Sequence, residues 1–162
     1  MVVPSFIADL RSFVGSRRLQ LVGVTAVVLR PGPHGRQQVL LVQGRDEQHW
    51  GPVTGILEPD EQPAHTAKRE CLEETGVLVS PSVLVSVYTS AVKSFPNGDV
   101  AQFLEIVFRC DWISGLPQPI DAEVESAAWF GIDELPTMSS DAHSRIAAAM
   151  RATTTADFVP AP

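Results

Sequence analysis

The sequence contains few of the residues on which several classes of protein depend. Two of its 162 residues are cysteines, too few for a disulfide framework. The 12 basic residues are outnumbered by 19 acidic ones and lie scattered along the chain, so that the formal net charge is −7. Nucleic-acid polymers are bound by clustered Lys and Arg, and we therefore expect no such partner. No apolar run reaches the roughly 18 residues that a membrane-spanning helix requires, so no membrane partner is expected either.

The positions of the cysteines and histidines argue against two further kinds of site. Cys71 falls in an acidic segment of helical pattern and Cys110 at the end of a predicted strand. Both are therefore expected to be small buried side chains in a reducing, cytoplasmic environment. The histidines, at positions 34, 49, 65 and 143, show no ligand spacing with the cysteines, and a zinc site is not expected. Residues 1–14 carry Asp9 and Arg11 within their apolar stretch, unlike a signal peptide.

The remaining composition is that of one soluble globular domain, with 44% hydrophobic and 19% charged residues. We assign residues 1–152 to this domain, with an N-terminal helical extension at 1–17 and a loose tail at 153–162. The order of predicted elements is compatible with an α/β or an α+β fold. Periodicity and turn residues predict helices at 4–14, about 61–75 and 139–151, and strands at 19–29, 38–43, 53–57, 83–95, 100–110 and 127–130.

Two pairs of these strands are expected to form antiparallel hairpins. A turn rich in Pro and Gly at 31–35 separates the strands at 19–29 and 38–43. Asn97-Gly98 separates the strands at 83–95 and 100–110, and this dipeptide is a strong hairpin signal.

The most informative stretch is 55–77, GILEPDEQPAHTAKRECLEETGV. Residues three and four apart share one face of a helix, so Glu70, Glu73 and Glu74 lie within one arc of about 100°. Three like charges in that arc repel one another and weaken an isolated helix. A bound divalent cation removes this repulsion, and Mg²⁺ in particular bridges a few carboxylates to substrate phosphates. The stretch therefore predicts a site for metal and phosphate, on a helix that Gly76 ends.

This stretch resembles the signature of the Nudix hydrolases, G-x5-E-x7-R-E-U-x-E-E-x-G-U, in which U is apolar. Every specified position is filled. The resemblance implies an α/β/α sandwich, with a mixed β-sheet between helices, and extends weakly over residues 18–151. It also implies hydrolysis of a nucleoside diphosphate linked to another group, dependent on Mg²⁺ or Mn²⁺. The matching residues are Gly55, Glu61, Arg69, Glu70, Cys71, Glu73, Glu74, Gly76 and Val77.

The resemblance further implies a role for each polar residue of the signature. Glu70, Glu73 and Glu74 would be metal ligands together with the backbone carbonyl of Gly55, and Arg69 would orient glutamates such as Glu61. The general base stays open, because family members differ in which carboxylate serves. The candidates are the box glutamates Glu70 and Glu74 and three downstream acids, with Glu123 ranked first, Glu125 second and Asp121 third.

Recognition of the rest of the substrate must come from outside this stretch. Arg45 is a candidate anion clamp, and Trp50 and Phe95 are candidate walls for a base, although each also fits a purely structural role. Nucleoside triphosphates and ADP-ribose or nucleotide sugars remain equal candidates. A catalytically inactive Nudix-like domain that senses a nucleotide is the alternative function, and a homodimer is an open alternative to the monomer.

Two positions depart from the usual family pattern, which often has Gly-Gly before the signature and Gly-Glu before its helix. Here Thr54-Gly55 and Asp60-Glu61 occupy these places. We expect altered loop geometry at these positions and no loss of activity.

Overall fold

A computed structural model describes residues 4–45, 49–151 and 154–158. The helices are α1 (Ser5–Val14), α2 (Pro63–Thr75) and α3 (Ser140–Met150), with a short 3-10 turn, η1 (Pro33–Gly35). The strands are β1 (Leu19–Pro31), β2 (Gln37–Gly44), β3 (Trp50–Gly51), β4 (Val53–Ile56), β5 (Leu78–Thr89), β6 (Lys93–Ser94), β7 (Val100–Ser114), β8 (Val124–Gly131) and β9 (Asp157–Phe158). Within the part of the chain that the structure describes, no helix has the length and apolar character needed to cross a bilayer.

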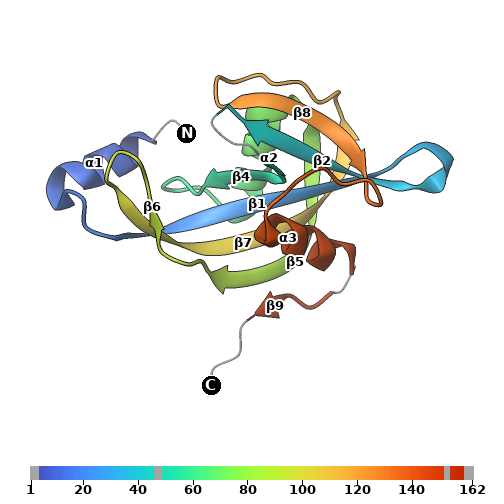
Figure 1. Ribbon diagram of the computed structural model, residues 1–162. Coiled ribbons are helices and arrows are strands. Elements are labelled where there is room, and N and C mark those ends of the chain that lie inside the picture. The colour runs from blue at the N-terminus through green and yellow to red at the C-terminus, as the bar shows by residue number, and fades with distance from the viewer. Residues whose placement is uncertain (1–3, 46–48, 152–153, 159–162) are drawn as a thin grey trace.

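The strands form one mixed sheet with α2 on one face and α3 on the other (Figure 1). The main path runs β3-β2-β1-β7-β5-β9, while β4 pairs with β1, β6 with β7 and β8 with β2. The central pair, β1 and β7, is parallel, and β5 and β7 are antiparallel. The predicted α/β/α sandwich with a mixed sheet is therefore confirmed.

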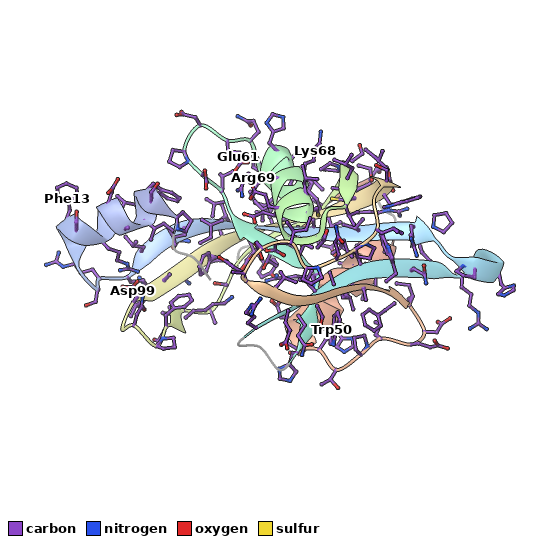
Figure 2. All side chains as sticks on the ribbon, turned by 90° about the horizontal axis from the view of Figure 1, so that it is seen from above. Phe13, Trp50, Glu61, Lys68, Arg69 and Asp99 are labelled. Carbon is purple, nitrogen blue, oxygen red and sulfur yellow. The ribbon has the colours of Figure 1, made fainter. Side chains whose placement is uncertain are left out.

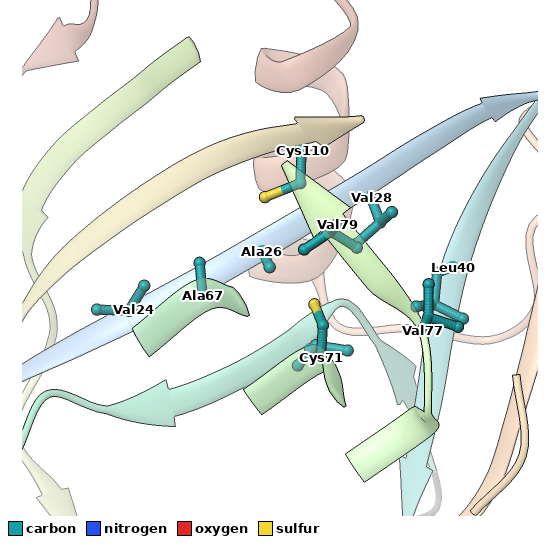
Figure 3. Packing of buried hydrophobic residues seen from close by; sticks show 10 residues of the cluster. Val24, Ala26, Val28, Leu40, Ala67, Cys71, Val77, Val79 and Cys110 are labelled. Carbon is teal, nitrogen blue, oxygen red and sulfur yellow. The ribbon is translucent and has the colours of Figure 1, made fainter. Parts of the chain in front are cut away.

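Strand β1 distributes its side chains to both layers, since alternate residues of a strand point to opposite faces. Val24, Ala26 and Val28 belong to the core between the sheet and α2, and Val27 and Leu29 to the core between the sheet and α3. Figure 3 shows the first of these cores from close by. Cys71 and Cys110 are both fully buried in it as free thiols, as the sequence predicted, and burial raises the pKa of Cys110 to about 12.

The N-terminal helix is docked on the sheet. Ile7 of α1 packs against Leu21, Ala101 and Phe103. Arg11 adds an ion pair of 3.2 Å with Asp99 and donates a hydrogen bond of 2.9 Å to the carbonyl of Val100.

Both predicted hairpins are present, but the second differs in detail. Strand β5 begins at Leu78, earlier than predicted, because Pro81 is accommodated within it beside a register shift between Pro81 and Val83. It also ends at Thr89, and the separate strand β6 carries the chain into the turn at Asn97-Gly98.

Part of the tail predicted to be loose joins the sheet. Asp157 and Phe158 form β9 and pair in parallel with Ser86 and Val87 of β5. Residues 152–153 and 159–162 lie outside the described residues.

Candidate active site

The signature helix, α2, begins at Pro63, two residues later than predicted, and its end matches the prediction. Pro63 suits the first helical position, where its missing N–H is not needed. Gly76 ends the helix in the left-handed conformation, with φ 70° and ψ 9°, and its N–H donates to the carbonyl of Leu72. The stripe of Ala67, Cys71 and Thr75 is buried, which leaves the neighbouring face of the helix for the carboxylates.

Arg69 ties the carboxylates of the signature together. Its Nε and Nη2 donate to the two carboxylate oxygens of Glu61, at 2.9 and 3.0 Å, and its Nη1 donates to Glu70 at 2.8 Å and to Glu73 at 3.1 Å. Figure 2 shows Glu61 in the loop before α2, beside Arg69 on the helix. Thr66 donates a further hydrogen bond to Glu61 at 2.8 Å. Glu61 is thus held from two sides, and these bonds lower its pKa.

Gly55 of β4 lies directly under the side chain of Glu70. A Cβ added at position 55 would stand 1.9 Å from Oε1 of Glu70 and 2.3 Å from its Cγ, distances that no pair of non-bonded atoms tolerates. The backbone of Gly55 has no positive φ, so the glycine is required by this close approach and not by its own conformation.

A cavity of about 240 Å³ brings the signature together with the downstream acids. Glu123 and Asp121 line it together with residues of α2 and β4. Asp121 accepts hydrogen bonds from the backbone N–H groups of Glu123 and Val124, at 2.9 and 3.1 Å, and so organises this loop. Glu125 lies in β8 with an exposed side chain and is not among the described wall residues. The acidic wall of the cavity consists of Glu58, Glu70, Glu73, Glu74, Asp121 and Glu123.

The pKa of Glu70 is raised in this cavity. Burial is the main cause that raises its pKa to about 7, Arg69 opposes the rise, and the charges of Glu73 and Glu123 add to it. Glu74, with 9% of its surface exposed, is also buried. A positive charge in the cavity would favour the ionised carboxylates, since an opposite charge lowers the pKa of an acid.

The donor set fits a hard divalent cation, but its ligands are not assembled. Carboxylate and carbonyl oxygens are the groups that Mg²⁺ prefers. Among the described residues, no group of three Asp, Glu, His or Cys side chains is placed to hold a metal as it stands. Arg69 occupies one oxygen each of Glu70 and Glu73, so a cation bound by them would compete with Arg69 for these oxygens.

The three predicted substrate residues are not brought together. Trp50 lines a polar hollow on the α3 side of the sheet and packs edge-on against Phe130, with 4.8 Å between ring centroids. Phe95 lines an apolar hollow beside α1. Arg45 is absent from the described wall of the carboxylate cavity, and its backbone N–H donates to the carbonyl of Glu123.

Sequence reasoning missed a buried polar cluster on the α3 side. Arg145 of α3 donates hydrogen bonds of 2.8 Å to the hydroxyls of Tyr88 and Thr25. It also pairs with Asp141 at 2.7 Å and with Glu105 at 3.4 Å. No local pattern marks this set, because its members come from four separate elements.

Asp60, which stands where the family often has glycine, has a positive φ. Asp60 adopts φ 64°, the left-handed conformation that glycine occupies most readily and that Asp tolerates better than most residues. The loop before α2 thus contains, at Asp60, a turn conformation that glycine favours.

The chain thus combines a mixed sheet between helices with an acid-lined cavity beside the signature helix α2. The family model for the NUDIX domain matches residues 19–151. The chain therefore belongs to the Nudix family and is a pyrophosphohydrolase.

Curated relatives agree with this membership. A MutT-like protein of Streptomyces ambofaciens is 32% identical over 78% of this chain and 73% of its own length. The NAD-capped RNA hydrolase NudC of Vibrio cholerae is 31% identical over 64% of this chain, which spans only 36% of that protein. A putative ADP-ribose pyrophosphatase of Bacillus subtilis, YjhB, is 30% identical over 63% of this chain and 48% of its own length.

Solved structures share the fold. The crystal structure of a UDP-X diphosphatase superposes with a TM-score of 0.67 at 19% identity, over 98% of this chain and 75% of the other.

Proposed function

We propose that this protein hydrolyses the pyrophosphate bond of a nucleoside diphosphate linked to another group, and that it requires Mg²⁺, or Mn²⁺ in its place. The observation that carries this proposal is the cavity whose wall brings Glu70, Glu73 and Glu74 together with Glu123 and the backbone of Gly55.

The metal would be held by Glu70, Glu73, Glu74 and the carbonyl of Gly55. A bound divalent ion neutralises phosphate charge and makes water acidic enough to ionise near pH 7. The chain itself supplies the orientation of these ligands, because Arg69 fixes Glu70 and Glu73 from one side. Glu61 contributes indirectly by holding Arg69 with both of its oxygens.

Glu123 is our first candidate for the group that takes a proton from the attacking water. It lies in the wall of the cavity, in a loop that Asp121 organises. Glu70 and Glu74 are the alternatives. Glu70 has a pKa raised to about 7 before a cation enters, a value suited to proton transfer near neutral pH, although a bound metal would lower it.

For the substrate, we retain nucleoside triphosphates and ADP-ribose or nucleotide sugars as the classes to test. The name of the relative from Bacillus subtilis, a putative ADP-ribose pyrophosphatase, supports the second class. The apolar hollow that contains Phe95 adjoins the carboxylate cavity through Pro4 and Ile56, which supports a place for a nucleobase there.

The proposal is tested by assaying release of nucleoside monophosphate with Mg²⁺, with Mn²⁺ and with EDTA. Glu73→Gln and Glu74→Gln should each lower kcat by about a hundredfold or more, with the fold retained by circular dichroism. Glu123→Gln should lower kcat while its neighbour Glu125→Gln, exposed on β8, should not. If the Glu73 and Glu74 variants match the wild type, the metal assignment fails. If the wild type binds nucleotides and cleaves none of them, the sensing alternative gains support.

The environment and assembly of the protein are also open to test. Two buried free thiols support the cytoplasmic location that we propose. Phe13 and Leu10 of α1 are 87% and 43% exposed, which supports α1 as the contact of a proposed homodimer. Light scattering of the wild type and of Phe13→Ser would decide between dimer and monomer.

A further inference from the structure

Helix α1 lies outside the part of the chain that the family model matches, which begins at residue 19. It begins where two hollows meet: its N-cap residue, Pro4, lines both the carboxylate cavity and the apolar hollow that contains Phe95. Ile56, next to Gly55 in β4, also lines both spaces. We call the apolar space the α1-side hollow. A molecule held at Gly55 therefore has this hollow as a neighbouring space.

Three parts of the chain line the α1-side hollow, and α1 lies beside the turn between β6 and β7 (Figure 1). Its volume is about 280 Å³, near the lower end of the range for small-molecule sites, about 300–1,000 Å³. Two aromatic rings and several aliphatic side chains in its lining suit the flat ring of a nucleobase. The lining comes from α1 (Pro4, Ile7, Arg11), from the sheet (Leu21, Ile56, Ala101, Phe103) and from the turn (Phe95, Pro96, Asn97, Asp99).

One buried side chain and one arginine hold α1 in this position. Ile7 is the only buried residue of the helix. Arg11 donates from Nη2 to the carbonyl of Val100 at 2.9 Å, and its Nε lies 3.2 Å from a carboxylate oxygen of Asp99. The side chains of Arg11 and Asp99 are only 13% and 24% exposed, so water screens this ion pair less than a pair on the surface. Arg11 is therefore a main attachment of α1 to the turn.

The partners of Arg11 are fixed at both ends. The carboxylate of Asp99 accepts a hydrogen bond of 3.0 Å from the side-chain amide of Asn97, and the N–H of Asp99 donates to the side-chain carbonyl of Asn97 at 3.1 Å. Nη1 of Arg11 donates to the carbonyls of Gly15 and Arg17, where α1 ends. Neither Arg11 nor Asp99 is among the described residues that line the carboxylate cavity. A change at Arg11 should therefore alter the α1-side hollow and leave the carboxylates in place.

We propose that α1 is a wall of the substrate site: the α1-side hollow takes the nucleobase, and Arg11 is the positioning residue that keeps this wall against the turn. Arg11 acts through the position of the helix and takes no part in bond cleavage. This inference rests on the proposed function, which places the pyrophosphate at Gly55, beside the hollow.

The binding test compares AMP and UMP with ribose 5-phosphate, which has no base, by calorimetry with Mg²⁺. The wild type should bind one of the two nucleotides more tightly than ribose 5-phosphate. Arg11→Gln should weaken that binding by about tenfold, the effect of one lost charge-assisted hydrogen bond, and leave ribose 5-phosphate unaffected. Arg11→Lys keeps a positive charge near Asp99 and should lose less. Arg18→Gln, at an exposed arginine between α1 and β1, is the matched control and should change neither affinity.

The kinetic test uses whichever of ATP, ADP-ribose and UDP-glucose is hydrolysed. Arg11→Gln should raise KM by about tenfold and leave kcat nearly unchanged, because it removes binding that ground state and transition state share. Asp99→Asn breaks the same ion pair from the turn and should reproduce this split between KM and kcat. Thermal unfolding of each variant separates loss of the wall from loss of the fold.

The outcomes separate this inference from the proposed function. Nucleotide affinity that Arg11→Gln leaves unchanged, or a wild type that binds ribose 5-phosphate as tightly as both nucleotides, would overturn the wall assignment and leave the pyrophosphohydrolase intact. Equal weakening of nucleotide and ribose 5-phosphate would also overturn it, because the base would not be the group recognised. If a wide nucleotide panel stays uncut while Arg11→Gln still weakens nucleotide binding alone, the proposed function fails and the wall remains.

Discussion

The contact between Gly55 and Glu70 predicts how Gly55→Ala changes the stability of the protein. The substitution should destabilise the wild type but not a variant that lacks the Glu70 side chain. In the wild type, Gly55→Ala inserts a methyl group 1.9 Å from Oε1 of Glu70. Glu70 must then swing away from β4 and give up its 2.8 Å hydrogen bond to Arg69. Overpacking of this kind costs about 1–3 kcal/mol, and we expect Gly55→Ala to destabilise the metal-free protein by that amount.

In a Glu70→Ala background, the three atoms nearest to the added methyl group are no longer present. Gly55 lies in a strand with no positive φ, so alanine fits its backbone, and glycine within a strand is less stable than alanine by about 0.5–1 kcal/mol. Gly55→Ala should therefore be neutral or slightly stabilising there. The double-mutant cycle isolates the clash because no other residue lies as near to the added methyl group as Glu70 does.

The assay is urea unfolding in EDTA, for the wild type, both single variants and the double variant. Metal-dependent hydrolysis is measured on the same four proteins, where each single variant should lose about a hundredfold or more of kcat and the double variant little further. An equal stability loss from Gly55→Ala in both backgrounds would refute the close-approach argument. Full activity in Gly55→Ala would refute the position assigned to Glu70.

Three further predictions concern the same helix and the loop before it. The pKa of Glu70 is raised from 4.5 to about 7, so between these pH values the folded protein binds more protons than the unfolded one. The stability of the metal-free protein should therefore fall as pH rises through 7. Denaturant unfolding across pH 5–8 should show this fall in the wild type and less of it in Glu70→Gln. Arg69→Lys cannot span both oxygens of Glu61 and should weaken Mg²⁺ binding by about 10–100-fold in calorimetry, whereas Lys68→Arg should not. Asp60→Ala should cost about 1 kcal/mol more stability than Asp60→Gly, because φ at this position is 64°, and thermal melts that rank the two variants the other way would contradict this.

The features predicted from sequence are those fixed by neighbours along the chain. The carboxylate face of α2 follows from helical periodicity, its end from the need for a left-handed residue at Gly76, and the turn between β6 and β7 from Asn97-Gly98. The start of β5 was misplaced because Pro81 is a poor strand residue in general, yet here a register shift accommodates it.

The buried polar cluster around Arg145, on the α3 side of the sheet, could not be predicted from neighbours along the chain. Arg145 and Thr25 are separated by 120 positions and meet only because α3 covers the face toward which alternate residues of β1 point. Within its own helix, Arg145 looks like one more polar residue of an amphipathic pattern.

Strand β4 places two neighbouring residues, Thr54 and Gly55, on opposite faces of the sheet. Gly55 must be glycine because Glu70 occupies the space where its side chain would lie. Thr54, one residue earlier, faces the opposite side of the sheet. Its side chain there lines the polar hollow that Trp50 and Arg145 also line. A glycine at position 54 would leave the space on the α3 side wider, because Thr54 lines it. A substitution at position 54 can therefore change the space on the α3 side, while position 55 is held to glycine by the close approach of Glu70.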